Sequence, residues 1–122
     1  MVEIGDDAPD FELLDQDNNL VTGSEHSGKK VILAFFPAAF TGVCTTEMCA
    51  FESSLSRLNN AGTVVLGICA DSRFANKAFA EGNNLNFRIL SDYTRSTIEA
   101  YGIALHDFAG MPGYTASERA VF

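Results

Sequence analysis

The sequence predicts an α/β domain in which a mostly parallel central sheet lies between helices. Two continuous apolar blocks, at residues 31–36 and 64–69, and a shorter one at 87–90 are typical of strands buried on both faces. Between the blocks, apolar residues recur every three or four positions, as on one face of a helix. Strand and helix therefore alternate along the chain, and this order favours parallel strands with helices on the faces of the sheet.

The first half of the chain supplies a hairpin, a strand and a long helix. Residues 10–24 alternate apolar and polar positions around a polar turn at 15–19, which predicts an N-terminal β-hairpin. The strand at 31–36 stops at Pro37. The helix that follows ends at residues 59–62, where Asn-Asn-Ala-Gly supplies a stop signal. Its apolar face consists of Cys44, Met48, Phe51, Leu55 and Leu58.

The second half continues the alternation. After the strand at 64–69, either Asp71 or Ser72 is expected to cap a helix that ends at Gly82. A third helix is predicted over residues 93–101. Residues 119–122 have strand character, but they are fewer than the five residues of an average strand.

Composition limits the classes of function. A chain of 122 residues with 47% apolar residues predicts one domain, residues 1–122. The net charge of −8 argues against nucleic-acid binding, and the longest apolar stretch, residues 31–40, is too short to span a membrane. The first residues lack the pattern of a secretion signal, so a cytoplasmic location is expected. Three cysteines without an export signal favour thiol chemistry or buried thiols over a disulfide framework.

Cys44 lies where a helix begins. With Thr41 as the N-cap, Cys44 would be the third helical residue, close to unpaired backbone N–H groups and the positive end of the helix dipole. This position favours a thiolate, the reactive form of cysteine. Cys44 also belongs to the apolar face of its helix. The residues alone therefore leave two interpretations open, an activated nucleophile and a buried structural thiol.

The segment around Cys44 resembles a family signature. Pro37, Thr41 and Cys44 match the P-x3-T-x2-C pattern of the peroxiredoxins, and Gly5–Phe11 is similar to the family's G-x-x-A-P-D-F. Residues 71–79 and 90–92 also resemble family sequence. The similarity covers the whole chain and is greatest to the bacterioferritin-comigratory and alkyl hydroperoxide reductase E branches. It implies a thioredoxin-like fold and a thiol peroxidase that reduces hydrogen peroxide and organic hydroperoxides without a metal, flavin or haem cofactor.

The resemblance also implies a role for each residue of the signature. Cys44 would be the peroxidatic nucleophile and become a sulfenic acid. Thr41 would hold the peroxide through its hydroxyl, and Pro37 would shield the thiolate from water. Arg119 would stabilise the thiolate and the charge on the leaving oxygen. Glu47 would orient Arg119 through a charge-assisted hydrogen bond.

The other two cysteines, Cys49 and Cys69, lie outside the signature. Cys49 follows Cys44 at a spacing that some peroxiredoxins use for a resolving cysteine. On a helix the two Cα atoms would be ~8–9 Å apart, so a disulfide requires local unwinding; Cys49 would otherwise be an idle thiol. In that case an external reductant, thioredoxin-like or a small thiol, would complete the cycle. Cys69 reads as a core residue. His26 and His106 share no ligand spacing with the cysteines, so no metal site is expected.

Two other hypotheses remain. A thioredoxin-like disulfide oxidoreductase would have the same fold, but the sequence lacks the C-x-x-C spacing that this chemistry uses. The second is a non-catalytic fragment or assembly module. After the arginine, the family continues with further strands and a helix, so the domain is expected to be C-terminally incomplete, with an open sheet edge. A homodimer or a completing polypeptide is the expected partner in that case.

Overall fold

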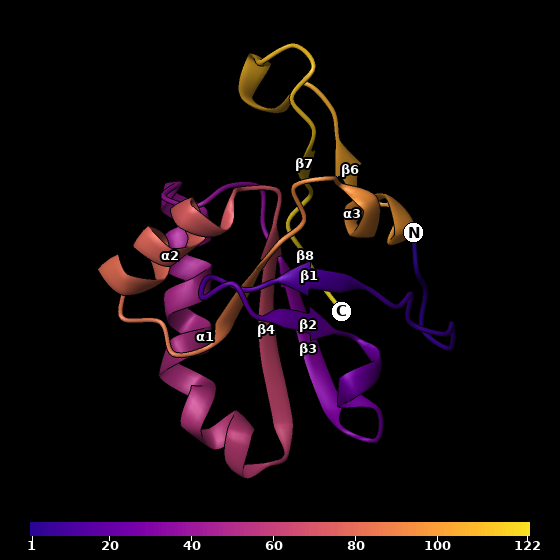
Figure 1. Cartoon of the computed structure of the whole chain (residues 1–122), viewed down its shortest axis with the longest axis vertical. Helices are drawn as coiled ribbons and strands as arrows, with labels where there is room; N and C mark the ends of the chain where they lie inside the picture. Colours follow the sequence, from indigo (N-terminus) through magenta and orange to yellow (C-terminus); the bar gives the residue numbers. More distant parts are fainter.

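A six-stranded sheet in the order β2-β1-β5-β4-β3-β8 forms the centre of the protein (Figure 1). The structure is a computed structural model and describes all residues, Met1–Phe122. The sheet strands are β1 (Glu12–Leu14), β2 (Leu20–Thr22), β3 (Lys30–Phe35), β4 (Thr63–Cys69), β5 (Arg88–Ser91) and β8 (Ala120–Val121). The helices are α1 (Gly42–Asn60), α2 (Arg73–Gly82) and α3 (Ser96–Ala100), with 3₁₀ turns η1 (Ser24–His26) and η2 (Phe108–Gly110). A separate pair of short strands, β6 (Ala104–Leu105) and β7 (Ala116–Ser117), forms a second, two-stranded sheet.

The sheet is mixed, with the predicted parallel strands at its centre and antiparallel strands at both edges. Only the central strands β3, β4 and β5 are parallel to one another. The hairpin strand β1 is antiparallel to both β2 and β5, and β8 is antiparallel to β3. The connections between strands explain this arrangement. Helices α1 and α2 cross over between the central strands and so keep them parallel, whereas the N-terminal hairpin reverses the direction of the chain.

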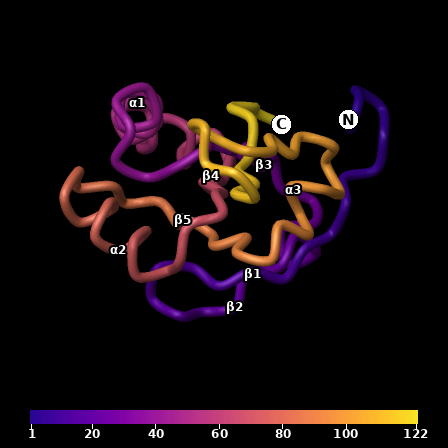
Figure 2. The backbone as a smooth tube through the Cα atoms, turned by 90° about the horizontal axis from the view of Figure 1, so that it is seen from above, coloured from indigo at the N-terminus to yellow at the C-terminus, as the bar shows by residue number.

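The two faces of the sheet carry separate apolar clusters. Successive strand residues point to opposite faces, so in β3 Leu33 and Phe35 belong to one cluster, whereas Ala34 and the following Phe36 belong to the other. Helices α1 and α2 pack on the side of Ala34 and Phe36, and α3 lies on the opposite side (Figures 1 and 2). The structure is thus the three-layer α/β arrangement of a thioredoxin-like fold. None of its helices combines the length and the apolar character needed to cross a membrane.

The predicted hairpin, central strands and first two helices are confirmed, with boundaries within two residues. Helix α1 ends one residue before Ala61, and Gly62 then adopts a φ of 75°, a conformation that glycine tolerates best. Helix α3 is shorter than predicted and begins at Ser96. The arm formed by β6, η2 and β7, which extends away from the sheet in Figure 1, was not predicted at all. The single, C-terminally incomplete domain stays a prediction.

A buried carboxylate explains why α3 begins late. Arg95, the residue before the helix, has a φ of 64° and makes no capping hydrogen bond with its side chain. The carboxylate of Asp92, which is 0% exposed, instead accepts the backbone N–H groups of Thr97 at 3.2 Å and Ile98 at 2.7 Å. The first donors of α3 are therefore satisfied from outside the helix, by the residue that follows β5.

We predict that Asp92→Ala lowers the free energy of unfolding by about 1–3 kcal/mol, because it leaves two buried N–H groups without an acceptor. Urea denaturation at neutral pH measures the change. Asp17→Ala is the matched control, since Asp17 is largely exposed and its ion pair with Lys77 spans 3.7 Å at the surface. Equal stability of the two variants would contradict the capping role.

Candidate active site

Cys44 lies in the first turn of α1, as the sequence predicts. Thr41 is the N-cap in an extended conformation, which makes Cys44 the third helical residue. The Thr41 hydroxyl does not cap the helix; it donates to the carbonyl oxygen of Ala38 at 3.0 Å. The backbone N–H groups of Gly42, Val43 and Cys44 consequently have no acceptor within the helix. The Cys44 side chain is 0% exposed.

The loop that connects β3 to α1 holds the other two residues of the signature. Pro37 is buried directly after the sheet and has no N–H group to leave unsatisfied there. Phe40 adopts a φ of 66°, in the left-handed region, and its ring packs edge-on against Phe79 of α2 at a centroid distance of 5.3 Å. The loop therefore places Pro37 and Thr41 on either side of a sharp turn that leads into α1.

Arg119 reaches the same place from the other end of the chain. It precedes β8, which pairs with β3 in the register Phe35 to Ala120. Its guanidinium Nη1 donates a hydrogen bond to Cys44 Sγ at 3.1 Å, between residues 75 positions apart in sequence. This contact places a permanent positive charge against the sulfur, as the resemblance implies.

Glu47 is not placed as expected. No hydrogen bond or ion pair joins Glu47 to Arg119, because the guanidinium is directed at the Cys44 sulfur one helical turn earlier. The Oε1 atom of Glu47 is buried and has no hydrogen-bond partner. Burial raises the pKa of Glu47, and the charge of Arg119 lowers it to a smaller extent. The two side chains therefore interact through charge alone.

Cys69 shares an apolar cluster with Cys44 but differs in its polar contacts. Its thiol donates to the Oδ1 atom of the Asn76 side chain at 3.1 Å. Burial, and to a smaller extent the Asp71 carboxylate, raise the pKa of Cys69 far above the ordinary value. Cys69 is thus a protonated core thiol at neutral pH and a poor nucleophile. The prediction that it is a core residue is confirmed.

Cys49 is a free thiol on the same continuous helix as Cys44. The sequence places it among polar residues away from the apolar face. In the structure it is half-buried, packs against the apolar cluster that contains Cys44 and contacts Asn83 Oδ1 at 3.8 Å. The C-cap residue of α2 thus contacts Cys49, which helix geometry alone does not reveal. A disulfide with Cys44 would require α1 to unwind between them.

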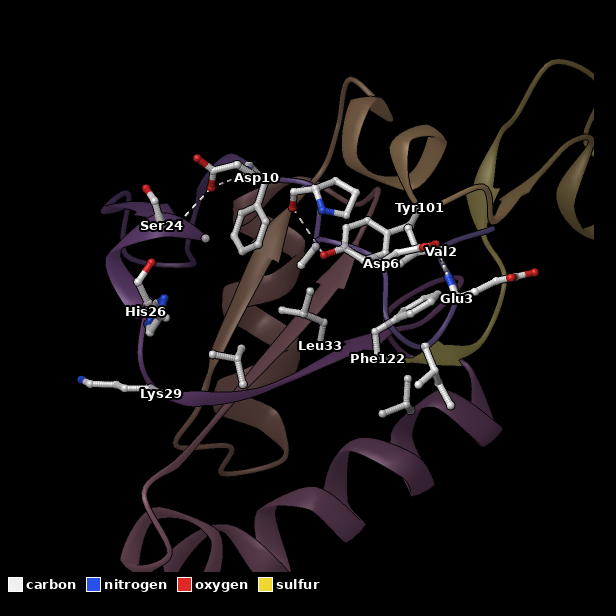
Figure 3. Close-up of a pocket in the computed structure, with 18 of the residues that line it drawn as sticks. Val2, Glu3, Asp6, Asp10, Ser24, His26, Lys29, Leu33, Tyr101 and Phe122 are labelled. Atoms are coloured by element: carbon white, nitrogen blue, oxygen red, sulfur yellow. Dashed lines mark hydrogen bonds between the residues drawn. The ribbon is translucent and has the colours of Figure 1, made fainter.

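A pocket on the other side of the sheet is not part of this site. It has a volume of about 1270 Å³ and lies on the α3 side of the sheet, where Leu33, Tyr101 and Phe122 form part of its wall (Figure 3). Cys44 belongs to the apolar cluster on the other face. The hydroxyl of Tyr101 donates to the Pro9 carbonyl there at 3.4 Å.

Sequence reasoning missed one polar residue next to the site. Asp71 was considered as a cap of α2, but the cap is Ser72, whose hydroxyl accepts the N–H of Ala75. The Asp71 carboxylate instead accepts the N–H of Ala39, in the loop between Pro37 and Thr41. An acidic residue at the carboxyl end of a central strand was the available signal, because that edge of a parallel sheet is where sites gather.

Comparison with known proteins agrees with this geometry. The AhpC/TSA family model matches residues 4–122. A putative peroxiredoxin bcp of Coxiella burnetii is 38% identical over 121 residues, 99% of this chain and 80% of that protein. A chloroplastic peroxiredoxin Q of Triticum aestivum is 38% identical over 112 residues, 92% of this chain but 52% of that protein. Peroxidoxin BcpB from Mycobacterium tuberculosis has a similar structure, with a TM-score of 0.85 and 28% identity over 97% of this chain and 75% of that one.

The fold and the paired cysteine and arginine define the class of a thiol peroxidase. The chain belongs to the AhpC/TSA family, as a peroxiredoxin of the bcp and peroxiredoxin Q type. The chain spans about half the length of the plant relative and four-fifths of that of the bacterial one.

We predict that Arg119→Ala slows the reaction of Cys44 with hydrogen peroxide about 100-fold, because it removes the charged donor at the sulfur. Alkylation of Cys44 by iodoacetamide at neutral pH should slow as well, since the thiolate loses its nearest positive charge. Stopped-flow kinetics and peptide mass spectrometry measure the two rates. Arg57→Ala, an exposed arginine of α1, is the control. Alkylation that is unchanged in Arg119→Ala would contradict a direct effect on the sulfur.

Proposed function

We propose that this protein reduces hydrogen peroxide and organic hydroperoxides through Cys44. The observation that carries the proposal is the 3.1 Å hydrogen bond from Arg119 to a cysteine in the first turn of a helix. Both the guanidinium and the free N–H groups of that turn favour a negative charge on the Cys44 sulfur. A nucleophilic thiolate and a leaving oxygen anion both require this environment.

The chemistry follows from these groups. The Cys44 thiolate attacks one oxygen of the peroxide, so that an S–O bond forms while the O–O bond breaks. The sulfur is oxidised to a sulfenic acid, and the other oxygen takes a proton and leaves as water or an alcohol. The Thr41 hydroxyl can accept from the peroxide while it donates to Ala38. Pro37 keeps water from the sulfur.

The surface beside Cys44 favours peroxides with an apolar group. Phe40 and Val43 are each 61% exposed although they are large apolar residues; Val43 directly precedes Cys44 and Phe40 lies four positions before it. Exposed apolar side chains next to a reactive centre offer contact area to an alkyl substituent. This supports organic hydroperoxides as substrates in addition to hydrogen peroxide.

The cycle closes when a thiol reduces the sulfenic acid. Cys49 is our candidate for this resolving thiol: it would attack the sulfenic sulfur, form a disulfide with Cys44 and release water. A thioredoxin-like protein or a small thiol would then reduce the disulfide, or the sulfenic acid directly if Cys49 is idle. The cytoplasmic location and the homodimer or completing partner stay predictions.

We predict that Cys44→Ser abolishes peroxide consumption, whereas Cys69→Ser retains it within about threefold, because only Cys44 combines the helix terminus with Arg119. Consumption of peroxide in the presence of dithiothreitol measures the activity. Residual turnover in Cys44→Ser equal to the parent would overturn the proposal. Rapid reduction of insulin disulfides with no peroxide turnover would favour a disulfide oxidoreductase instead.

A second prediction concerns Cys49. After one equivalent of peroxide, the intact protein should be about two daltons lighter than the reduced form, since a disulfide loses two hydrogens. Hydrogen exchange should increase in residues 42–49, because the first turns of α1 must unwind. In Cys49→Ser the product should be a sulfenic acid, 16 daltons heavier in mass spectra, as one oxygen is gained. A parent protein that accumulates sulfinic acid with Cys49 free would show that an external thiol resolves Cys44.

A further inference from the structure

Asp71 lies between the loop that precedes α1 and the arm formed by β6, η2 and β7. It follows β4 directly, and one carboxylate oxygen, Oδ2, accepts the backbone N–H of Ala39 at 2.8 Å. The other oxygen, Oδ1, accepts the hydroxyl of Tyr114 at 3.5 Å. Ala39 belongs to the loop between Pro37 and Thr41, and Tyr114 belongs to the arm between η2 and β7. A single side chain thus connects the signature loop to the arm.

Asp71 and its partner Tyr114 are themselves held by neighbouring residues. Its backbone carbonyl accepts the hydroxyl of Ser91 on the neighbouring strand β5. Arg95 donates to the Thr115 carbonyl at 2.8 Å and lies over the ring of Tyr114, with 5.3 Å from the guanidinium carbon to the ring centroid. Burial, and to a smaller extent Asp71, raise the pKa of Tyr114, so its phenol stays protonated and can donate. Asp71 therefore has a fixed position relative to the sheet.

The loop that Asp71 holds has no regular secondary structure of its own. Its internal contact is the hydrogen bond from the Thr41 hydroxyl to Ala38, and Phe40 occupies the left-handed region, which is unfavourable for a bulky side chain. The Ala39 N–H is the one backbone donor within this turn that reaches another element of the fold. Thr41 is bonded to α1 through its carbonyl, which accepts from Thr45, so the Ala39 N–H is what ties the preceding part of the turn to the sheet.

We infer that Asp71 is a positioning residue for peroxide reduction, because its carboxylate fixes the Pro37–Thr41 loop through the Ala39 N–H. The inference rests on the proposed function of Cys44. The negative charge of Asp71 is not what the reaction uses, since a negative charge near a thiolate disfavours it. The geometry of the acceptor oxygen is what matters, and this distinguishes the role from an electrostatic one.

Three variants separate geometry from charge. Asp71→Asn keeps an acceptor oxygen at the same place and removes the charge. Asp71→Glu keeps the charge but displaces the oxygens, and Asp71→Ala removes both. We expect the second-order rate constant for hydrogen peroxide to fall about tenfold or more in Asp71→Ala, less in Asp71→Glu and within about threefold in Asp71→Asn. Asp17→Asn, at an exposed position, serves as the surface control.

A second measurement is the rate at which iodoacetamide alkylates Cys44, followed by peptide mass spectrometry. A general structural defect would lower this rate as well as the peroxide rate. Because alkylation uses the Cys44 sulfur but not the Thr41 hydroxyl that holds the peroxide, we expect it to stay at the parent rate or rise in Asp71→Asn and Asp71→Ala. If Asp71→Ala does not fold, the order of Asp71→Asn above Asp71→Glu still tests the inference. An Asp71→Asn variant as slow as or slower than Asp71→Glu, or peroxide rates equal to the parent in all variants, would overturn it. A parent protein without peroxidase activity would instead refute the proposed function.

Discussion

The antiparallel pairing of β8 with β3 is the constraint on which the site depends. It sets Phe35 opposite Ala120, so that Arg119 lies level with the end of β3, where the loop to α1 begins. Because strand side chains alternate, Ala120 and Phe122 point into the apolar cluster on the α3 side, and Arg119 points to the side of α1. A one-residue shift in register would turn the arginine away from the sulfur. The distance of 3.1 Å between Nη1 and Sγ is therefore a consequence of sheet register.

Cys44 and Cys69 show how polar neighbours decide the chemistry of two equally buried thiols. Both are 0% exposed and belong to the same apolar cluster. Beside Cys44 lie a guanidinium and the unpaired N–H groups of a helix terminus, all of which stabilise an anion. Beside Cys69 lie an amide oxygen and a carboxylate, which stabilise a protonated thiol. Because both thiols are equally buried, the polar neighbours are what distinguish them, and a low dielectric strengthens each of these interactions.

Much of the fold could be predicted because its signals are local. The central strands, α1 and the place of Cys44 at its third position follow from apolar periodicity and a threonine at the N-cap position. Arg119 could be placed only through the family resemblance, since its contact depends on a pairing between strands far apart in sequence. Asp71 could not be assigned a role, because nothing local shows which loop lies opposite the end of β4. The arm was missed because its strands have two residues each and its turns place Asp107 and Ala109 at positive φ.

The aromatic residues on the far side of the sheet hold Arg119 in place. Strand β8 has two residues and lies at a sheet edge, so backbone pairing alone would leave it frayed. Phe122 adds two hydrogen bonds with Leu33, at 2.8 and 3.0 Å, and its ring packs at 4.9 Å from Tyr101 and 5.8 Å from Phe35. Aromatic pairs contribute about 0.5–1.5 kcal/mol each beyond the area they bury. The guanidinium is thus fixed on one face by packing on the other, and the site needs no contact between Arg119 and Glu47 to hold its geometry.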